Sequence, residues 1–489
     1  MFGFFRRYLL YFCKIWRQVL AKTARRIYNI IYEYFTRWIT EKLAAYFKDV
    51  KSIGLFGFGK SNRAIFERLS RMSHLNFTLR DERSREDAPS GVRLCLGEEC
   101  FAPPYEDILF LSPSVRRDRP ELARMREAGV RLCSDAELFF ALCDAPILAV
   151  SGSDGKSTTV TMTEAILRQS GIDALACGNL GLPFISALDG QRDLFVAEIS
   201  SFTLEYLTPR TTRALLTNIT ENHLDWHGSF EAYIGAKENL LRHTDSAILS
   251  PDTEAVAALI RKWQPRVIFS GRYSFSELRR QYPFAEQIYT SEGGELRANG
   301  NTVLPVSNLA KKEPHNISNA LAAIALTEGL FNTGGGVSAL CDFEAPAHRA
   351  ETVAVAGGVR YVDSSIDSTP SRTCATLAAM PRDTHIILGG RGKGLSYAPL
   401  AAALASLSGA ILICGENQGE IAEALLELRE RVILCENLFS ATKRAAEIAR
   451  GGDTVLLSPA STSYDAFSDF EERGNKFKEY VKIITEGVK

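Results

Sequence analysis

A three-unit α/β fold is predicted by two patterns in this chain of 489 residues and by its length. From residue 51 onward, short apolar runs alternate with segments of helical periodicity. Several of these runs end in glycine or in a charged residue, as strands of a doubly wound sheet do where they lead into a helix. At roughly 150 residues per domain, the length suits about three domains. We therefore expect boundaries near residues 145 and 347, after an N-terminal extension over residues 1–45.

The extension is basic and amphipathic. Residues 1–40 contain eight Lys or Arg and a single Glu, although the whole chain has a formal net charge of −1. On a helical wheel the basic residues share one half, and aromatic and aliphatic residues share the other. This pattern predicts an extra amphipathic helix and is typical of helices that lie on a membrane surface. Packing on the body or on a partner, or a misassigned start codon, remain alternatives.

Composition excludes several other classes of protein. The rest of the chain is acidic, which argues against a nucleic-acid-binding body. The ten cysteines include no C-x-x-C pair, which indicates reduced thiols in a cytoplasmic protein. No uncharged apolar run approaches the roughly 18 residues that a membrane span needs. The first residues also lack a signal-peptide cleavage site. We expect a cytoplasmic monomer.

The first unit, residues 46–145, opens with "SIGLFGFGKSN". This stretch resembles the G-x-G-x-x-G dinucleotide turn, with Asn62 in place of the last glycine. It puts a helix N-terminus where an anionic ligand could bind. Asp81, about twenty residues on, ends "FTLRD", where a carboxylate would accept a hydrogen bond from a ribose hydroxyl. An ordinary turn without ligand is left open by these residues alone.

The second unit, residues 146–347, opens with a phosphate-loop pattern. A buried strand over 146–150 precedes "SGSDGKSTT", and a helix is expected over about 157–169. Gly152 and Gly155 allow the backbone to wrap a phosphate, Lys156 supplies a positive charge, and Ser157 can ligate Mg²⁺. The first glycine of the full P-loop pattern is absent, since Val150 stands there.

Further polar residues follow the next strands. Glu198 ends "DLFVAE", where a buried carboxylate needs a cation or a salt bridge. His223 lies in "TNITENHLDWHG", and Lys237 lies on the helix that follows. Taken alone, these two residues favour a polar loop with structural histidines and a solvated lysine. The third unit, residues 348–489, repeats the strand and helix alternation through "GVRYVDSS", "THIILGG", "AILICGE", "RVILCEN" and "DTVLLSPA".

The motifs, taken in order, resemble the Mur ligases, which add amino acids to UDP-N-acetylmuramoyl precursors of peptidoglycan. The resemblance covers about residues 50–489. The ending "LLSPASTSYDAFSDFEERGNKF" is most similar to the members that join D-glutamate to UDP-N-acetylmuramoyl-L-alanine. The other motifs that carry the resemblance are "SGSDGKST", "GNLGLPF", "EISSFTLE", "TNITENHLDWHGSFEAYIGAKENLL", "HNISNALAA", "HRAE" and "LGGRGKG".

The resemblance implies an ATP-dependent amide ligase with a Rossmann-like first domain, a central P-loop ATPase-like α/β domain and a Rossmann-like third domain. The family's shorter loop, G-x-x-G-K-[ST], matches Gly152 to Ser157, so no glycine is missing. It also implies two Mg²⁺ ions: Ser157 and Glu198 match ligands of one, and His223 matches a ligand of the other. Lys237 matches a lysine carbamylated by CO₂, which overturns the solvated reading. Nucleotide contacts are implied at Gly152, Ser153, Asp154, Gly155, Lys156, Ser157, Thr158, Asn316, Asn319 and Arg349, and catalytic roles at Lys156, His223, Lys237 and Arg349.

The resemblance also implies where the substrates bind. The uridine diphosphate is expected at Ser61, Asn62, Asp81, Arg83 and Ser114, and the muramoyl-alanine portion at Asn179 and Ser200. The incoming D-glutamate is expected at Lys393, Ser463 and Phe470.

Two departures from the family pattern leave alternatives open. Asp154 stands where an Asn is usual and brings a negative charge to a phosphate site. In "VDSSIDSTPSRT", Ile366 replaces the usual Lys, and the ribose-binding Asp falls on Ser364 or, with a shift, on Asp363. A ligase of the same fold with another amino-acid or folate specificity, or a binding paralogue with impaired catalysis, is therefore also considered. A membrane scaffold is a third alternative.

Overall fold

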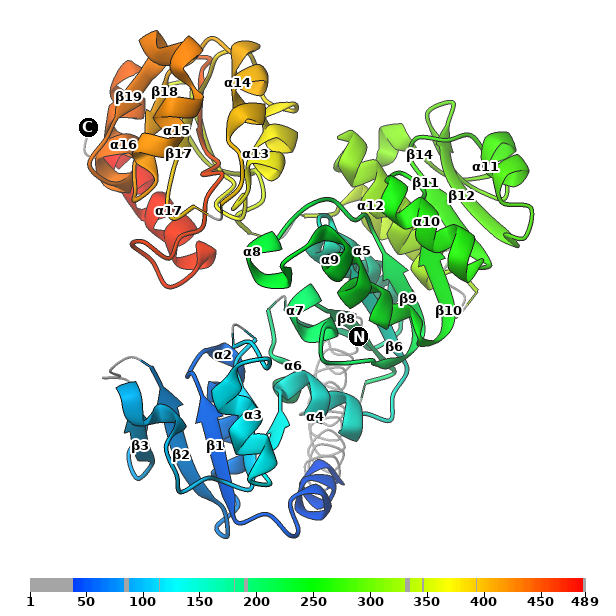
Figure 1. The fold of residues 1–489 in the computed structure, drawn as a ribbon. Coiled ribbons are helices and arrows are strands. Elements are labelled where there is room, and N and C mark those ends of the chain that lie inside the picture. The colour runs from blue at the N-terminus through cyan, green and yellow to red at the C-terminus, as the bar shows by residue number, and fades with distance from the viewer. Residues whose placement is uncertain are drawn as a thin grey trace, which may run out of the picture.

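The computed structural model describes residues 38–82, 88–113, 115–179, 181–188, 192–329, 335–344, 347–392 and 394–486, without the side chain of Asp225. Strands in this part of the chain form three separate sheets of five, nine and six strands, against which helices pack (Figure 1). The fold is mixed α/β, and most neighbouring strands are parallel. We call the parts built on these sheets the N-terminal, central and C-terminal domains.

The N-terminal domain has a fully parallel sheet of order β3-β2-β1-β4-β5. A helical segment over residues 38–46 buries Ile39 and Leu43 against it. Strand β3 was not predicted, because two of its four residues are exposed and its apolar pattern is weak. The elements are β1 (Ser52–Phe56), α2 (Lys60–Leu69), β2 (Asn76–Asp81), β3 (Arg93–Leu96), β4 (Ile108–Leu111), α3 (Pro120–Glu127), β5 (Arg131–Cys133) and α4 (Asp135–Leu142).

The central sheet has the order β14-β13-β12-β11-β10-β9-β6-β8-β7 and is parallel except for β13 and β14. Strand β6 lies between β8 and β9, so the loop after β6 meets the carboxyl ends of both neighbours. The strands are β6 (Ile147–Ser151), β7 (Ala174–Gly178), β8 (Leu194–Glu198), β9 (Arg210–Leu216), β10 (His243–Leu249), β11 (Val267–Ser270), β12 (Gln287–Glu292), β13 (Glu295–Ala298) and β14 (Asn301–Pro305). The helices are α5 (Lys156–Gln169), α6 (Phe184–Ala187), α7 (Ser201–Leu204), α8 (Leu224–His227), α9 (Phe230–Glu238), α10 (Glu254–Trp263), α11 (Phe275–Gln281) and α12 (Pro314–Thr327).

The C-terminal sheet has the order β15-β16-β20-β17-β18-β19, with only β15 antiparallel to its neighbour. Its two hydrophobic clusters consist of residues of this domain alone. The elements are β15 (Glu351–Ala356), β16 (Val359–Asp363), α13 (Pro370–Leu377), β17 (Thr384–Leu388), α14 (Ala398–Ala405), β18 (Ile411–Ile413), α15 (Gln418–Ala424), β19 (Val432–Leu434), α16 (Leu438–Ile448), β20 (Thr454–Leu457) and α17 (Phe470–Glu486).

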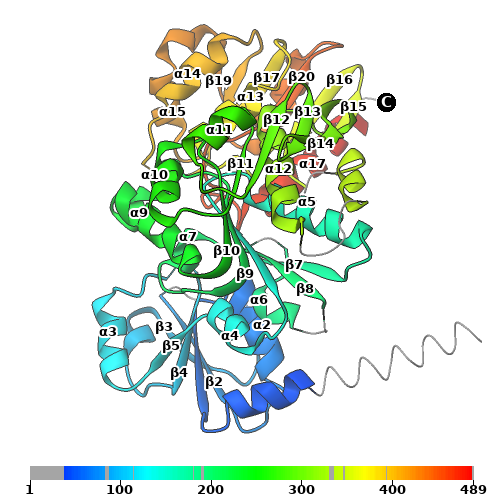
Figure 2. The ribbon, with the colours of Figure 1, turned by 90° about the vertical axis from the view of Figure 1, so that its right-hand side faces the viewer.

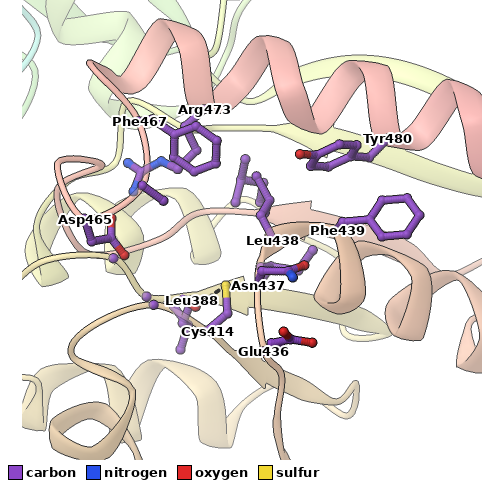
Figure 3. A pocket seen from close by; sticks show the side chains of 16 residues that line it. Leu388, Cys414, Glu436, Asn437, Leu438, Phe439, Asp465, Phe467, Arg473 and Tyr480 are labelled. Carbon is purple, nitrogen blue, oxygen red and sulfur yellow. Dashed lines mark hydrogen bonds between the residues drawn. The ribbon is translucent and has the colours of Figure 1, made fainter.

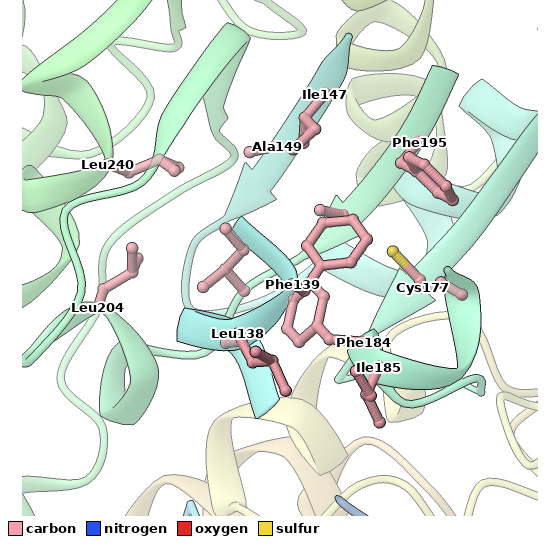
Figure 4. Packing of buried hydrophobic residues seen from close by; sticks show 14 of the residues in the cluster. Leu138, Phe139, Ile147, Ala149, Cys177, Phe184, Ile185, Phe195, Leu204 and Leu240 are labelled. Carbon is pink, nitrogen blue, oxygen red and sulfur yellow. The ribbon is translucent and has the colours of Figure 1, made fainter. Parts of the chain in front are cut away.

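An aromatic cluster joins the N-terminal and central domains. Phe139 on α4 packs against Phe184 on α6 and Phe195 on β8, with ring centroids 5.2 and 5.3 Å apart (Figure 4). Separation of the two domains would expose this large apolar area to water, so the aromatic contacts hold the domains together.

Polar contacts attach the C-terminal domain to the other two. Arg372 pairs with Asp154 of the central domain, and Lys60 on α2 pairs with Glu471 on α17 at 2.6 Å. Figure 2 shows the C-terminal domain beside the central one, at the end of the molecule away from the N-terminal sheet. A domain with its own core and polar contacts is suited to rigid-body movement. Among the residues described here, no helix is long and apolar enough to cross a membrane.

Candidate active site

The predicted phosphate loop joins β6 to α5, within one residue of the expected bounds. Its two glycines have positive φ angles of 142° at Gly152 and 80° at Gly155. A Cβ at Gly152 would lie 1.9 Å from Oγ1 of Thr217, and one at Gly155 would lie 2.3 Å from Oδ1 of Asn319. The loop therefore requires glycine at both positions, for backbone conformation and for space.

Residues after β9 hold this loop in shape. The Asp154 amide donates to Oδ1 of Asn218 at 3.0 Å, and Oγ1 of Thr217 donates to the Asp154 carbonyl at 2.6 Å. Ser153 shares a hydrogen bond of 2.9 Å with the hydroxyl of Tyr233. No role was predicted for Thr217, Asn218 or Tyr233, although all three lie in the motif "TNITENHLDWHGSFEAYIGAKENLL", which was the available signal.

Two lysines converge on the loop. Nζ of Lys156 donates to the carbonyls of Gly152 and Ser153 at 3.0 and 2.8 Å. Nζ of Lys237, a residue only 1% exposed, donates to the same Gly152 carbonyl at 2.8 Å. Burial, and then the charge of Arg372, lower the pKa of Lys156 to about 8. Burial, and then the charge of Lys156, lower the pKa of Lys237 well below its ordinary value. Lys237 is thus not a solvated surface lysine.

Glu198 ends β8 beside this loop, in register with Val150 of β6. The residue is 1% exposed, and its Oε1 accepts a hydrogen bond of 3.0 Å from Nδ2 of Asn179. Its Oε2 is buried and has no hydrogen-bond partner among the described residues. Since an unpaired buried carboxylate oxygen is costly, this atom fits a hard cation such as Mg²⁺.

His223 and Tyr233 connect the loop to α8 and α9. His223 adopts a left-handed conformation with φ of 55°, which is uncommon for a residue with a side chain. Its ring centroid lies 4.7 Å from that of Phe202 and 6.5 Å from that of Tyr233. The Tyr233 ring lies 4.6 Å from Nζ of Lys237. Tyr233 thus contacts the phosphate loop and Lys237 and packs near His223.

Arg349 enters the same region from the C-terminal domain. It lies between His348 and Ala350, whose φ angles of 64° and 48° are both left-handed. Burial, and then the nearby Arg372, lower the pKa of Arg349 to about 10, while Glu198 and Asp154 oppose this shift. Arg349 is therefore close enough to the phosphate loop to interact with its charges.

Asp363 has partners inside the C-terminal domain. Its Oδ2 lies 2.6 Å from Nδ1 of His348, and its Oδ1 accepts from the Ser365 amide at 2.9 Å. The carboxylate is fully buried. The contact of Asp363 with a ribose stays a prediction, and these contacts already engage both of its oxygens.

The other predicted residues lie in all three domains. In the C-terminal domain, Ser463 is buried, and the Phe470 ring lies 6.3 Å from that of His348. Lys393, Arg83 and Ser114 lie outside the described residues, as do residues 1–37 of the predicted extension.

In the N-terminal domain, Ser61 and Asn62 begin α2, and Asp81 ends β2. Asn62 is fully buried, and its Nδ2 donates to the Gly57 carbonyl at 2.7 Å, so its side chain holds the turn between β1 and α2.

In the central domain, two asparagines and two hydroxyl residues have local partners. Nδ2 of Asn319 donates to Oδ1 of Asn316 at 3.4 Å, and Oγ of Ser200 caps α7. Thr158 is buried in the first turn of α5.

Arg372 is a residue of the site that was not predicted from the sequence. It lies in the first turn of α13, and its Nε donates to Oδ1 of Asp154 at 2.6 Å. The stretch "VDSSIDSTPSRT" contains it, but no spacing rule connects two residues 218 positions apart.

A cavity of about 370 Å³ lies at the carboxyl ends of β17 and β18, next to α16 and α17 (Figure 3). Asp465, Phe467, Arg473 and Tyr480 are among its lining residues, all of which belong to the C-terminal domain. Arg473 donates to the carbonyls of Ser365 and Ser461, so its guanidinium supports the wall. This cavity is therefore not the place where the phosphate loop and Arg349 meet.

Comparison with known proteins identifies the family. A family model for the Mur ligase middle domain matches residues 150–327, and one for the Mur ligase glutamate ligase domain matches residues 348–461. UDP-N-acetylmuramoylalanine--D-glutamate ligase of Acetivibrio thermocellus is 33% identical over 391 residues, which cover 77% of this chain and 83% of that protein. The enzyme of the same name from Clostridium novyi is 32% identical over 462 residues, with coverage of 90% and 98%.

Solved structures agree at the level of the fold. UDP-N-acetylmuramate-alanine ligase from Thermotoga maritima aligns with a TM-score of 0.59 and 19% identity, over 88% of this chain and 99% of that one. A pseudomurein peptide ligase type C from Methanothermus fervidus aligns with a TM-score of 0.54 and 16% identity, over 90% and 100%. The resemblance inferred from the motifs is confirmed, and the chain belongs to the Mur ligase family.

Proposed function

We propose that this protein is an ATP-dependent ligase that joins D-glutamate to UDP-N-acetylmuramoyl-L-alanine in the synthesis of peptidoglycan precursors. The observation that carries the reaction class is the convergence of Lys156 and Lys237 on the Gly152 carbonyl of a phosphate loop. The substrates are inferred from the names of relatives that align over most of the chain.

The chemistry begins with a carboxylate that is a poor acyl donor. The terminal carboxylate of UDP-N-acetylmuramoyl-L-alanine attacks the γ-phosphorus of ATP, which gives an acyl phosphate and ADP. The amine of D-glutamate then attacks the acyl carbon, a proton is lost, and inorganic phosphate leaves. Lys156 and Arg349 offset the negative charge that gathers on the transferred phosphoryl group, and the loop orients it.

Ser157 and Glu198 are the proposed ligands of one Mg²⁺ ion, and His223 with a carbamylated Lys237 those of a second. Bound Mg²⁺ would supply neutralisation of phosphate charge. The first site is supported by Oε2 of Glu198, which has no hydrogen-bond partner in the part of the chain that the structure describes. The lowered pKa of Lys237 supports the carbamate, because only a neutral amine reacts with CO₂.

We assign the remaining contacts by the family resemblance. Nucleotide contacts are proposed at Gly152, Ser153, Asp154, Gly155, Thr158, Asn316, Asn319 and Asp363. Contacts to the UDP-sugar substrate are proposed at Ser61, Asn62, Asp81, Arg83, Ser114, Asn179 and Ser200, and contacts to D-glutamate at Lys393, Ser463 and Phe470. Closure of the C-terminal domain would bring Arg349 and Lys393 over the loop.

The proposed domain organisation assigns the UDP-substrate to a Rossmann-like domain over residues 46–145, ATP to residues 146–347, and the amino acid to a Rossmann-like domain over residues 348–489. The order β3-β2-β1-β4-β5 of the first sheet supports the first assignment. We also propose a cytoplasmic monomer.

The proposed basic extension covers residues 1–45, and its membrane contact would come from residues before Ile39, because Ile39 and Leu43 pack against the N-terminal sheet. Co-sedimentation with liposomes that contain anionic lipid tests this contact. Binding should fall when residues 1–40 are removed, and equal binding with and without them would contradict it.

Phosphate release tests the function directly. The purified protein is given UDP-N-acetylmuramoyl-L-alanine, ATP and Mg²⁺ with D-glutamate, L-glutamate, L-lysine or diaminopimelate in turn. We expect release that depends on the UDP-substrate and on D-glutamate. Release with another amino acid, or with a folate acceptor, would reassign the specificity. Intact binding of the UDP-substrate without turnover would identify a binding paralogue.

A further inference from the structure

The phosphate loop contains an acidic residue whose charge opposes phosphate binding. Asp154 lies between Ser153 and Gly155, in the turn that leads into α5. A carboxylate beside the phosphates of a nucleotide raises the free energy of the bound state unless a cation offsets it. The backbone of Asp154 is held by Asn218 and Thr217, so the residue cannot readily swing away from the loop.

Arg372 is the cation that meets this carboxylate. Its Nε donates to Oδ1 of Asp154 at 2.6 Å, and its Nη2 donates to the Ser153 carbonyl at 3.3 Å. On its own domain, Nη1 donates to the Ile366 carbonyl at 3.3 Å, which anchors the guanidinium to the loop before α13. The arginine therefore bridges the C-terminal domain and two consecutive residues of the phosphate loop.

Both side chains of the pair are partly shielded from water, which strengthens the interaction between their charges. The side chains of Arg372 and Asp154 are 20% and 35% exposed. By contrast, Lys60 and Glu471, which join the C-terminal to the N-terminal domain, are 62% and 41% exposed. Exposed ion pairs contribute little to stability, whereas removal of one partner from a shielded pair leaves an uncompensated charge.

The surroundings of Arg372 are already cationic. Lys156 donates to the Ser153 carbonyl that Arg372 also contacts. Burial, and then Arg372, lower the pKa of both Lys156 and Arg349, so the three cations are close to one another. Although burial opposes the shift, Arg372 lowers the pKa of Asp154. Asp154 thus also compensates a cation that would otherwise crowd Lys156.

We propose that Asp154 and Arg372 form a closure latch, in which docking of the C-terminal domain delivers the positive charge that neutralises Asp154 in the phosphate loop. Arg372 acts through Asp154 and is a positioning residue. The phosphate loop therefore presents its full positive charge to ATP only when the C-terminal domain is docked against it. The latch rests on the proposed function in that its ligand is ATP.

The latch predicts an asymmetry between its two partners. Arg372→Gln leaves Asp154 anionic beside the phosphates, so the KM for ATP should rise at least about tenfold. Asp154→Asn removes the repulsive charge and leaves the Arg372 charge uncompensated beside the phosphates, so it should lower the KM for ATP. In the double variant Asp154→Asn/Arg372→Gln, loss of the carboxylate should restore most of the ATP affinity that Arg372→Gln loses.

Two further variants serve as a test of charge and as a control. Arg372→Lys keeps the charge but not the planar fork, so it should recover part of the affinity. Arg444→Gln removes an exposed partner of Glu447 on α16, whose side chains are 52% and 48% exposed, and should leave nucleotide binding unchanged. Small-angle X-ray scattering should show a larger radius of gyration for Arg372→Gln than for Arg444→Gln.

Calorimetry in the presence of Mg²⁺ measures the binding of a β,γ-imido ATP analogue. Because this analogue is not hydrolysed, the test is independent of turnover. If the protein binds the analogue but catalyses no ligation, the proposed function fails while the latch is still tested. The latch is overturned if Arg372→Gln binds the analogue as tightly as Arg444→Gln does. It is also overturned if the double variant binds no more tightly than Arg372→Gln alone.

Discussion

Lys156 and Lys237 donate hydrogen bonds to the same backbone oxygen, the carbonyl of Gly152, at 3.0 and 2.8 Å. The two residues come from different helices, α5 and α9, and are 81 positions apart in numbering. Two ammonium groups at one carbonyl repel each other, which favours the neutral form of the more buried Lys237. This relationship is consistent with the proposed roles, in which Lys156 is charged for phosphate binding and Lys237 is neutral for carbamate formation.

Lys237→Ala should therefore abolish most of the turnover. We expect a loss of at least about a hundredfold, because the site would lose the carbamate that is proposed to ligate the second Mg²⁺. A short-chain carboxylate such as acetate should restore part of the activity by occupying the place of the carbamate. Phosphate release measures both effects. Lys443→Ala on α16, an exposed position, is the matched control. Full activity of Lys237→Ala would contradict the carbamate assignment.

Nucleotide binding should take up protons at pH 8–9. The pKa of Lys156 is lowered to about 8, so in the free protein its charge is lost as the pH rises through this value. Bound phosphates favour the charged form and raise the pKa again, so binding draws a proton from solution. ATP affinity should accordingly fall above pH 8. Calorimetry in buffers of different ionisation enthalpy measures the uptake. Lys156→Arg stays charged throughout, and an equal uptake in that variant would assign the proton elsewhere.

Gly152→Ala should destabilise the fold by roughly 2 kcal/mol or more, because the new Cβ would overlap Oγ1 of Thr217 at a positive φ. Gly171→Ala, after α5, is the matched control, since it also has a positive φ but meets no atom within 4 Å. It should cost only about 1 kcal/mol of backbone strain. Urea unfolding compares the two free energies. Equal values would show that the contact with Thr217 relaxes without cost.

Glu198→Gln should leave the stability without Mg²⁺ unchanged or raise it. The amide oxygen can still accept from Asn179, while the change removes a buried carboxylate whose Oε2 has no hydrogen-bond partner among the described residues. The same change should abolish the extra stability that Mg²⁺ with nucleotide gives the unmodified protein. Thermal unfolding with and without MgCl₂ measures both. If Mg²⁺ with nucleotide still stabilises Glu198→Gln, the metal must be bound by other ligands.

Local patterns determined much of the architecture. A buried apolar strand followed by glycines and a helix start is a local signal, and β6, the phosphate loop and α5 were predicted within one residue. The strands from β10 to β14 were not predicted, although they form more than half of the central sheet. β11 and β13 have only four residues each, and β14 begins with two exposed residues, so their patterns do not separate them from turns.

By itself, the sequence determined the family, the reaction class and the residue types at the phosphate site, because these depend on short motifs and on resemblance. Only the tertiary structure decided which side chains meet. It showed that Oε2 of Glu198 has no hydrogen-bond partner among the described residues, that Lys156 and Lys237 share the Gly152 carbonyl, and that Asp154 pairs with Arg372. The physical reason is that such contacts join segments from different strands, helices and domains. Their distances follow from how the sheets and domains pack, which no local periodicity encodes.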